Sequence, residues 1–402
     1  MKQRRSILPL CAGILLMIGG ADWRQFRGPH SSGVAPEESG IFNPAGNVAW
    51  KIDLPGRGLS GPIVVGERVF LTASSGDKQD RLHVLAFAAS TGKKLWQRTV
   101  WATGPTDSHP KTCMAAPTPA SDGQRIIALF GTNDLLCLNL NGDVLWMRAL
   151  YEENPGATDG RGLAASPIIA GSTVVAHVEN QNASFAEGVD IETGKTRWHI
   201  DCPREMNWTS PIVLPGTTPA SDLVLLQGTT RLSACDPLTG REVWRLSQGG
   251  HPIASCARDG RILYVPAGDK LAAFALQPDA APPKLLWEQS KLGPAMASPV
   301  VSDGRVYSLR GSILACGDTR SGLVLSQLRL KGEFSSSPVI SGERLYCFNE
   351  KGMSYMIKLD GKEPIIETTA NLEDTILCTP AIANGALYVR SDRHLWKIGK
   401  SG

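Results

Sequence analysis

The chain has 402 residues, of which 42% are hydrophobic, 42 are glycine and 27 are proline, so most of it has enough apolar material to fold and is not disordered. Its charge is nearly balanced, with 41 basic and 38 acidic residues and no basic run, which argues against nucleic acid or an anionic membrane surface as a partner. The length allows either two or three domains or one large domain built from repeats.

The first 21 residues have the pattern of a secretory signal peptide. Lys2, Arg4 and Arg5 precede an apolar run over 7–18, and small residues lead to Ala21. We predict cleavage after Ala21 and therefore an exported protein, either periplasmic or secreted. The apolar run is shorter than the about 20 residues that a membrane-spanning helix needs, so no integral span is expected. Without these three basic residues the chain has 38 basic and 38 acidic residues.

Residues 22–44 come before the repeated part of the chain. They contain two large apolar side chains, Trp23 and Phe26, next to the breakers Gly28 and Pro29. We expect this N-terminal arm to lie along the folded domain with Trp23 and Phe26 as anchors, rather than to form a domain of its own.

One phrase recurs through residues 45–402. It consists of a small residue, Pro and two apolar residues, followed by Gly or Asp-Gly and a second apolar run. A degenerate copy around Cys256 fills the one gap in the series, so there are eight copies, 39 to 57 residues apart. Repetition at this spacing is typical of a propeller or a solenoid. The proline of the phrase stands at Pro62, Pro119, Pro167, Pro211, Pro299, Pro338 and Pro380.

Each copy has the features of β-structure. Short alternating runs are bounded by Gly and Asp, and no segment has a convincing helical period. A third run ends in a turn such as Thr239-Gly240-Arg241, where glycine supplies a positive φ, and a tryptophan opens a fourth strand. Four strands in every 40 to 50 residues, roughly, predict an all-β fold, an eight-bladed β-propeller with four antiparallel strands per blade. The tryptophans that recur at this phase are assigned to packing between blades: Trp50, Trp96, Trp146, Trp198, Trp244 and Trp287.

The two ends of the repeated region complete each other. Trp50 lies in an apolar run, 48–52, that has the character of a fourth strand without its first three. The last copy ends after three strands, the third of them around 394–398. We predict that the N-terminal strand closes the last blade, which removes a free sheet edge.

Residues 234–244, Ala-Cys-Asp-Pro-Leu-Thr-Gly-Arg-Glu-Val-Trp, resemble the tryptophan-docking motif A-x-D-x-x-T-G-K-x-x-W of pyrroloquinoline quinone (PQQ) repeat propellers. Residues 190–198 and 86–96 match nearly as well, with Ala88 in place of the motif aspartate. The resemblance covers residues 45–402 and implies the fold of quinoprotein alcohol dehydrogenases. Trp23 to Pro29, together with 109–111, is similar to a large group of exported bacterial PQQ-like propellers.

The resemblance leaves two activities open, because such blades occur in quinoprotein dehydrogenases and in non-catalytic scaffolds such as the outer-membrane assembly lipoprotein BamB. The enzymes need PQQ, a Ca²⁺ ion held by oxygen ligands and a general-base carboxylate. The adjacent cysteine pair common in that class is missing here, and Asp190, Asp236 and Asp318 are explained as turn residues. We expect no catalytic residue and no cofactor. The alternative is a PQQ- and Ca²⁺-dependent oxidoreductase acting on alcohols or sugars.

Loops that enter the first strand of each blade surround one mouth of a propeller channel and usually carry the binding site. One of these loops, 103–115, is long, and another places Trp208 outside the packing phase. Trp208 beside Asn207 suits a ligand, and Trp208 could equally plug the channel. The ligand-binding candidates are Arg57, His109, Lys111, Arg161, Asn207, Trp208 and His251.

The seven histidines are scattered, and the eight cysteines after the signal show neither CxxC nor zinc-type spacing, so no metal site is expected. The sequence predicts an exported, monomeric, non-catalytic binding or scaffold propeller. Its expected ligand is a protein or a carbohydrate at the loop-rich mouth of the channel.

Overall fold

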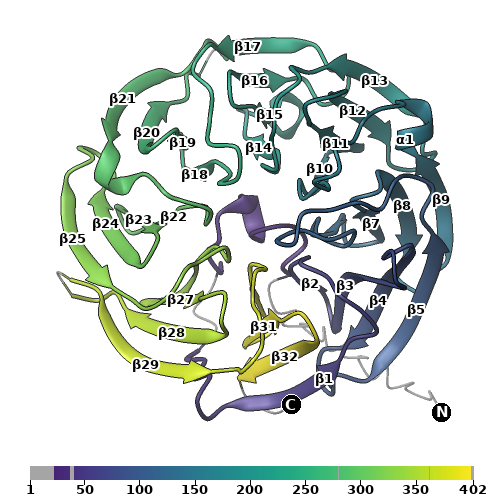
Figure 1. Ribbon diagram of the computed structural model, residues 1–402. Coiled ribbons are helices and arrows are strands. Elements are labelled where there is room, and N and C mark those ends of the chain that lie inside the picture. The colour runs from purple at the N-terminus through teal and green to yellow at the C-terminus, as the bar shows by residue number, and fades with distance from the viewer. Residues whose placement is uncertain (1–21, 37–39, 279, 362, 400–402) are drawn as a thin grey trace, which may run out of the picture.

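The computed structural model describes residues 22–36, 40–278, 280–361 and 363–399 (Figure 1). These residues form eight four-stranded antiparallel sheets, arranged as blades around a central channel. The predicted eight-bladed β-propeller is confirmed. The predicted signal peptide, residues 1–21, lies outside the described residues.

Blades 1 to 4 follow the chain from the first complete repeat. Blade 1 consists of β2 (Ile63–Val65), β3 (Arg68–Ser75), β4 (Arg81–Ala88) and β5 (Lys94–Trp101), and blade 2 of β6 (Ala120–Ser121), β7 (Arg125–Leu129), β8 (Asp134–Asn139) and β9 (Val144–Ala149). Blade 3 consists of β10 (Ile168–Ala170), β11 (Thr173–Val178), β12 (Phe185–Asp190) and β13 (Thr196–Asp201), and blade 4 of β14 (Ile212–Leu214), β15 (Leu223–Gln227), β16 (Leu232–Cys235) and β17 (Glu242–Leu246).

Blades 5 to 8 complete the ring. Blade 5 consists of β18 (Ala257–Asp259), β19 (Ile262–Ala267), β20 (Lys270–Ala275) and β21 (Lys284–Gln289), and blade 6 of β22 (Val300–Ser302), β23 (Arg305–Arg310), β24 (Ile313–Asp318) and β25 (Val324–Arg329). Blade 7 consists of β26 (Val339–Ser341), β27 (Arg344–Phe348), β28 (Met353–Lys358) and β29 (Ile365–Asn371), and blade 8 of β30 (Ala381–Ala383), β31 (Ala386–Arg390), β32 (His394–Gly399) and β1 (Val48–Asp53). The short helical segments are η1 (Pro29–Ser31), α1 (Leu150–Glu153), η2 (Pro219–Ser221) and η3 (Ser290–Leu292).

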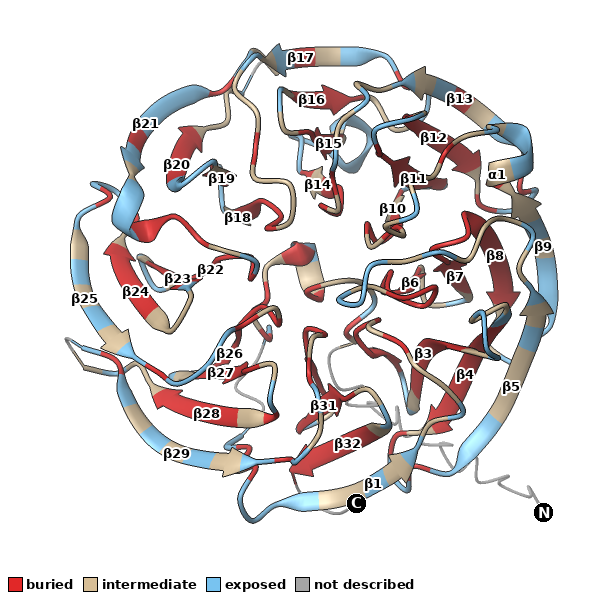
Figure 2. Ribbon diagram, in the orientation of Figure 1, coloured by how far each residue is buried: buried red, intermediate tan, exposed pale blue. Residues whose placement is uncertain are grey.

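Burial differs between the inner strands and the outer strand of each blade (Figure 2). The first three strands are largely buried, whereas an outer strand such as β25 alternates between half-buried and exposed side chains. The apolar clusters lie between neighbouring blades. One of them joins Ile212 and Leu225 of blade 4 to Leu263 and Phe274 of blade 5. The core is therefore distributed around the ring, and each blade is stabilised by the blades beside it.

The N-terminal strand closes the last blade, as predicted. β1 pairs antiparallel with β32, with Lys51 opposite Trp396 and Asp53 opposite His394. The Lys51 ammonium also lies 4.3 Å from the centre of the Trp396 ring. This pairing uses the edge of β32 and joins the two ends of the repeated region in one sheet.

The repeated tryptophans lie between the blades. Trp198 Nε1 donates a hydrogen bond to the Pro237 carbonyl of the next blade (2.8 Å), and its ring covers Gly240. Gly240 has a φ of 70°, and an added Cβ would lie 2.7 Å from Trp198 Cδ2, so the position suits glycine. The same bond to the next blade is made by Trp50, Trp96, Trp146 and Trp287. Trp244 is buried in the cluster between blades 4 and 5.

The described part of the N-terminal arm crosses the channel. Trp23 pairs with Val64 of blade 1, and Val34 pairs with Ile340 of blade 7. Between these bridges the purple segment that contains η1 lies at the centre of the ring in Figure 1. Trp23 is 1% exposed and packs on Gly28, whose φ of 63° and ψ of −146° favour glycine.

Candidate functional site

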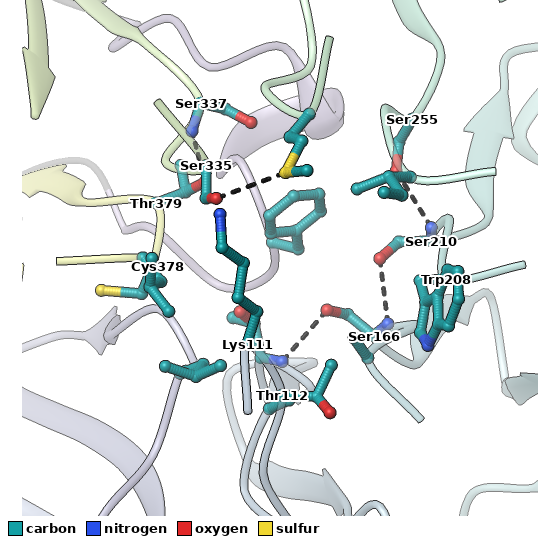
Figure 3. Close-up of a pocket in the computed structure, with 18 of the residues that line it drawn as sticks. Lys111, Thr112, Ser166, Trp208, Ser210, Ser255, Ser335, Ser337, Cys378 and Thr379 are labelled. Atoms are coloured by element: carbon teal, nitrogen blue, oxygen red, sulfur yellow. Dashed lines mark hydrogen bonds between the residues drawn. The ribbon is translucent and has the colours of Figure 1, made fainter. Parts of the chain in front are cut away.

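A cavity of about 380 Å³, here called the channel pocket, opens among the loops that enter the first strands (Figure 3). Its volume lies in the range of small-ligand sites. Its wall combines apolar side chains, hydroxyl groups and three basic side chains. The lining residues are Phe26, Leu59, His109, Lys111, Thr112, Ala116, Thr118, Arg161, Ala164, Ser166, Trp208, Ser210, Ile253, Ser255, Met296, Ser298, Ser335, Ser337, Leu377, Cys378 and Thr379.

Seven of these side chains form a hydrogen-bonded ring around the channel. Each is the small residue that precedes the repeated Pro or its Cys256 counterpart, and each hydroxyl oxygen accepts a hydrogen bond from the equivalent backbone N–H of the preceding blade. Ser166 Oγ, for example, accepts from Thr118 N at 3.0 Å, and Ser166 N donates to Ser210 Oγ at 2.9 Å (Figure 3). This hydroxyl ring consists of Thr118, Ser166, Ser210, Ser255, Ser298, Ser337 and Thr379.

The hydroxyl ring is open at blade 1, where the equivalent residue is Gly61. Its N–H donates to Thr118 Oγ1 (2.8 Å), but it has no side chain to accept a bond from Thr379. A Cβ at Gly61 would lie 2.7 Å from the Thr379 carbonyl oxygen, so the backbones pass too closely there for a larger residue. Among the described contacts, the ring hydroxyls act only as acceptors. Their hydrogens remain available to a molecule in the pocket.

Lys111 extends across the mouth of the channel pocket (Figure 3). Its ammonium pairs with Glu350 Oε1 at 2.9 Å, and the same oxygen accepts a hydrogen bond from Ser335 Oγ at 2.7 Å. His109 lies two residues earlier, and its Nδ1 accepts a hydrogen bond from the Lys111 backbone N–H (3.1 Å). Lys111 is half-exposed, so its charge is partly neutralised by Glu350 but open to solvent.

Arg57 holds the Lys111 loop rather than lining the pocket. Its guanidinium donates to the carbonyls of Thr112 (3.1 Å) and Pro110 (2.6 Å), and it lies 3.7 Å from Asp392. On the other side, Thr112 Oγ1 donates to the Arg161 carbonyl at 2.6 Å. The loop that carries His109 and Lys111 is therefore anchored to blade 1 and to the loop before blade 3.

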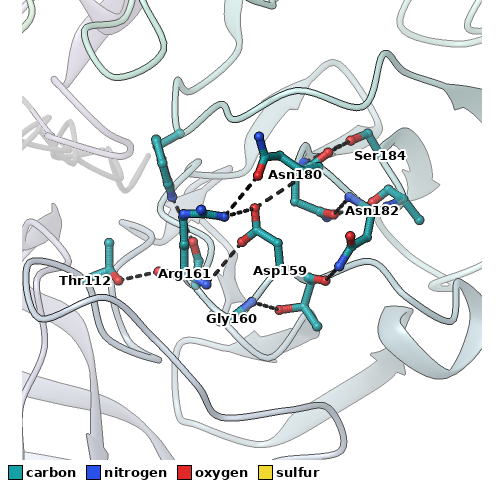
Figure 4. Close-up of polar contacts among 12 residues, drawn as sticks. Thr112, Asp159, Gly160, Arg161, Asn180, Asn182 and Ser184 are labelled. Atoms are coloured by element: carbon teal, nitrogen blue, oxygen red, sulfur yellow. Dashed lines mark hydrogen bonds and ion pairs between the residues drawn. The ribbon is translucent and has the colours of Figure 1, made fainter.

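Arg161 is the second cation at the mouth (Figure 4). Its guanidinium pairs with Asp159 at 3.0 Å and donates to Gln181 Oε1 at 3.3 Å, and 41% of its side chain is exposed. The turn behind it is held by side-chain bonds: Asn182 Nδ2 donates to the Thr158 carbonyl (2.7 Å). This network fixes Arg161, which lines the channel pocket, and leaves part of its charge accessible.

Trp208 forms part of the pocket wall. Its indole N–H donates to the Gly162 carbonyl at 2.8 Å, and the side chain is half-buried. The element that crosses the channel is the N-terminal arm and not this tryptophan, so Trp208 lies beside the opening instead of plugging it.

Besides Arg57, two further candidates lie away from the pocket wall. Asn207 is 2% exposed, and its amide donates to Glu179 Oε2 (2.6 Å) and to the Gln227 carbonyl. His251 Nδ1 accepts hydrogen bonds from the backbone of Ile253 and Ala254, both at 3.2 Å, and burial lowers the pKa of His251. Both side chains hold the local backbone, which is a structural role.

The sequence did not reveal the hydroxyl ring or the contribution of the N-terminal arm to the channel pocket. Phe26 of the arm faces the pocket, and Arg27 beside it is 1% exposed, with its guanidinium donating to the carbonyls of Cys256 and Pro299. Burial lowers the pKa of Arg27 to about 10. Cys378 also lines the pocket, but burial raises its pKa to about 11, so it is a neutral thiol at neutral pH. Only the repeated small residue before Pro hinted at the ring.

A family described as outer membrane protein assembly factor BamB matches residues 41–218, 188–277 and 228–311, which together span more than half of the chain. The chain belongs to this BamB-like family. The three matches overlap, in keeping with a repeated unit.

Several solved structures share the fold of this chain. The crystal structure of BamB from Moraxella catarrhalis is 17% identical, covers 88% of this chain and 97% of that one, and gives a TM-score of 0.66. A europium-containing methanol dehydrogenase is 12% identical, covers 94% of this chain and 98% of that one, and gives a TM-score of 0.75. At these identities the likeness establishes the fold alone.

One curated relative of the BamB-like chain is a polyvinylalcohol dehydrogenase from a Pseudomonas species. It is 22% identical over an alignment of 313 residues, and the match covers 58% of this chain and 45% of that protein. The chain thus spans less than half the length of this relative. Within the part of the chain that the structure describes, no helix is long and apolar enough to cross a membrane.

The channel pocket of the BamB-like chain lacks the groups that PQQ-dependent alcohol oxidation needs. Ca²⁺ takes six to eight oxygen ligands, several of them carboxylates, and the reaction needs a carboxylate base. None of the described residues that line the pocket is an Asp or a Glu. Glu350, at the mouth, is paired with Lys111. The residues present therefore do not fit Ca²⁺ with PQQ in this pocket, and we derive no catalytic step from it.

Proposed function

We propose that this protein is an exported binding propeller whose channel pocket receives an acidic segment of a protein partner. One observation carries the proposal: a pocket rimmed by Lys111 and Arg161 and lined by hydroxyl donors, without a carboxylate among its described lining residues. Each of these two cations is paired with one carboxylate of the protein itself, Lys111 with Glu350 and Arg161 with Asp159, and remains partly exposed. A carboxylate on a ligand can join these cations, and the ring hydroxyls can donate to its oxygens.

A protein partner is favoured over a carbohydrate for two reasons. BamB is a structural neighbour of this chain, and its family description is that of an assembly factor, which points to protein ligands. Sugars stack on accessible aromatic faces, whereas Trp208 is half-buried with its N–H bonded to Gly162. A cavity of about 380 Å³ admits a few side chains, so the partner would insert a short segment.

The test uses labelled synthetic peptides of equal length, one rich in Asp and Glu with one aromatic residue and one with Gln and Asn in place of the acids. Fluorescence anisotropy on the full mature protein should show that the acidic peptide binds more tightly than the Gln and Asn peptide. The affinity of the acidic peptide should fall as the salt concentration rises. Lys111→Ala and Arg161→Ala should each reduce its affinity about tenfold, which corresponds to about 1.4 kcal/mol.

Matched controls remove cations far from the pocket. Lys284→Ala and Arg320→Ala, both at exposed positions, should leave binding unchanged. Equal binding of both peptides, or equal losses in the controls, would contradict the proposal. Binding of an acidic oligosaccharide such as polygalacturonate that is lost in Lys111→Ala, without any peptide binding, would replace the protein partner with a carbohydrate.

The second candidate is a PQQ-dependent oxidoreductase, which the similarity to polyvinylalcohol dehydrogenase and methanol dehydrogenase favours. Thermal unfolding with PQQ plus Ca²⁺ distinguishes it from the binding module. A ligand at 100 times its dissociation constant adds about 2.7 kcal/mol of stability, so a saturable rise in the midpoint together with dye reduction by alcohols would support the enzyme. We expect neither.

A further inference from the structure

Three potential metal ligands meet at the edge of blade 3. His177 lies near the end of β11 and Glu179 follows two residues later, so both side chains point to the same face of the strand. Cys202 directly follows β13 and adds a thiol to this face. The imidazole nitrogen, carboxylate oxygen and sulfur all lie within 4.8 Å of one another, and His177 Nε2 is 3.0 Å from Glu179 Oε1.

The cluster is buried and incompletely satisfied. The His177 side chain is 1% exposed and that of Glu179 is 3% exposed. His177 Nε2 faces Glu179 without hydrogen-bond geometry to any described group, although it lacks contact with water. A buried polar nitrogen of this kind is costly unless another interaction satisfies it. A metal ion between the two side chains would supply that interaction.

The surroundings of the cluster leave room for a further ligand and hold the Glu179 carboxylate in place. A cavity of about 150 Å³ adjoins Glu179 and Cys202, large enough for a water molecule as a further ligand. Gly228 also borders this cavity. Asn207 donates to the other oxygen, Glu179 Oε2, at 2.6 Å. Groups that orient a ligand in this way are a regular feature of metal sites.

We propose that His177, Glu179 and Cys202 bind a zinc-class divalent ion, with water from the adjoining cavity as the fourth ligand. Nitrogen, sulfur and carboxylate oxygen are the donors that Zn²⁺ takes in proteins, and three protein ligands plus water give its tetrahedral geometry. Binding displaces one proton from the Cys202 thiol and one from the imidazolium if His177 is charged, and these protons pass to solvent. Charges around the cavity are balanced in part, since Arg245 is paired with Glu242 at 2.9 Å while Arg231 also borders it.

The ion would have a defined structural effect. Asn207, which orients Glu179, also forms an isolated backbone bridge with it and precedes Trp208 in the wall of the channel pocket. A bound ion would therefore fix the loop that presents Trp208. The metal site itself stands independently of the proposed function, because its readout is metal binding and not binding of a peptide.

The probe is Co²⁺, titrated into the reduced, metal-free, full mature protein, with Zn²⁺ in competition. We expect one Co²⁺ per chain, with the charge-transfer absorption of thiolate coordination, and displacement by Zn²⁺. Cys202→Ser should abolish the charge-transfer band, and His177→Gln should reduce the Co²⁺ affinity at least about 100-fold relative to the intact site. The matched control is Cys235→Ser, at a cysteine of the same cavity outside the three ligands, which should retain the band.

Wild-type protein that shows no saturable Co²⁺ or Zn²⁺ binding would overturn the proposal and leave a plain His177–Glu179 ion pair. A band that persists in Cys202→Ser, or disappears in Cys235→Ser, would also overturn the assignment. Because the wild-type titration needs no variant to fold, the first result holds even if His177→Gln is unstable.

Discussion

The outer rim of the propeller and its channel axis use repeated residues differently. At the rim, five of the six docking tryptophans donate a hydrogen bond to a carbonyl of the next blade, as Trp198 does to Pro237. At the axis, the hydroxyl ring also passes bonds from blade to blade, but each hydroxyl keeps a hydrogen for the pocket. The repeated tryptophans at the rim therefore stabilise the contacts between blades, whereas the repeated hydroxyl residues at the axis form a surface that faces the pocket.

The axis is also where the eightfold pattern is broken. Gly61 interrupts the hydroxyl ring, and Lys111 extends over one side of the mouth. The N-terminal arm crosses the channel and is held there by hydrogen bonds of Arg27. A regular ring would present the same groups in every direction. These departures give the pocket distinct sides, so a ligand can bind in one orientation.

The largest expected effect on stability lies at the axis. Arg27→Ala removes a buried guanidinium and leaves the Cys256 and Pro299 carbonyls without their donor, which should cost about 3 kcal/mol in the free energy of unfolding. Denaturant unfolding measures it. The control is Arg24→Ala, an exposed arginine of the same arm, with an expected cost of at most about 1 kcal/mol. Equal losses in the two variants would mean that the buried guanidinium of Arg27 stabilises the fold no more than an exposed arginine of the arm does.

A smaller effect is expected at the rim. Gly240→Ala places a Cβ against the Trp198 ring at a φ of 70°, so strain and displacement of the indole should together cost about 2 to 3 kcal/mol. Gly171→Ala is the matched control, because Gly171 has a similar φ of 59° and open space around its Cβ position. It should lose only about 1 kcal/mol by the same denaturant measurement. If the two variants lose the same amount, the indole contact does not constrain the turn.

The sequence predicted the rim far better than the axis. Blade number, strand count and closure by the N-terminal strand follow from local patterns, since each repeat contains its own turns and six of the eight blades carry a docking tryptophan. The pocket depends on which side chains meet across the ring. Asn207 was a reasonable candidate by residue type, but its side chain turns inward to Glu179, and sequence distance hides the approach of Cys202 to His177.

A buried histidine on the third strand of blade 1 supports the smallest prediction. His83 of β4 is 4% exposed, with Nε2 2.7 Å from Ser75 Oγ and Nδ1 2.9 Å from Thr99 Oγ1. Burial lowers the pKa of His83, and the charges of Arg81 and Lys94 lower it further. Histidine in the unfolded chain has a pKa near about 6.5, so as the pH falls the unfolded chain binds a proton at this residue before the folded blade does. The stability that neutral His83 contributes is full above that pH and is lost as the pH falls toward its folded pKa.

His83→Gln removes the titrating group while it keeps polar atoms between the two hydroxyls. The free energy of unfolding of the wild type should fall more steeply than that of His83→Gln as the pH drops from about 7 to about 5, as measured by denaturant titrations at each pH. His30→Gln, at an exposed position of the arm, should follow the wild-type profile. Parallel profiles for wild type and His83→Gln would show that blade 1 accommodates the imidazolium. Blade 1 would then tolerate a buried charge away from the axis, as the axis tolerates Arg27, and the contrast between the axis and the rest of the ring would narrow.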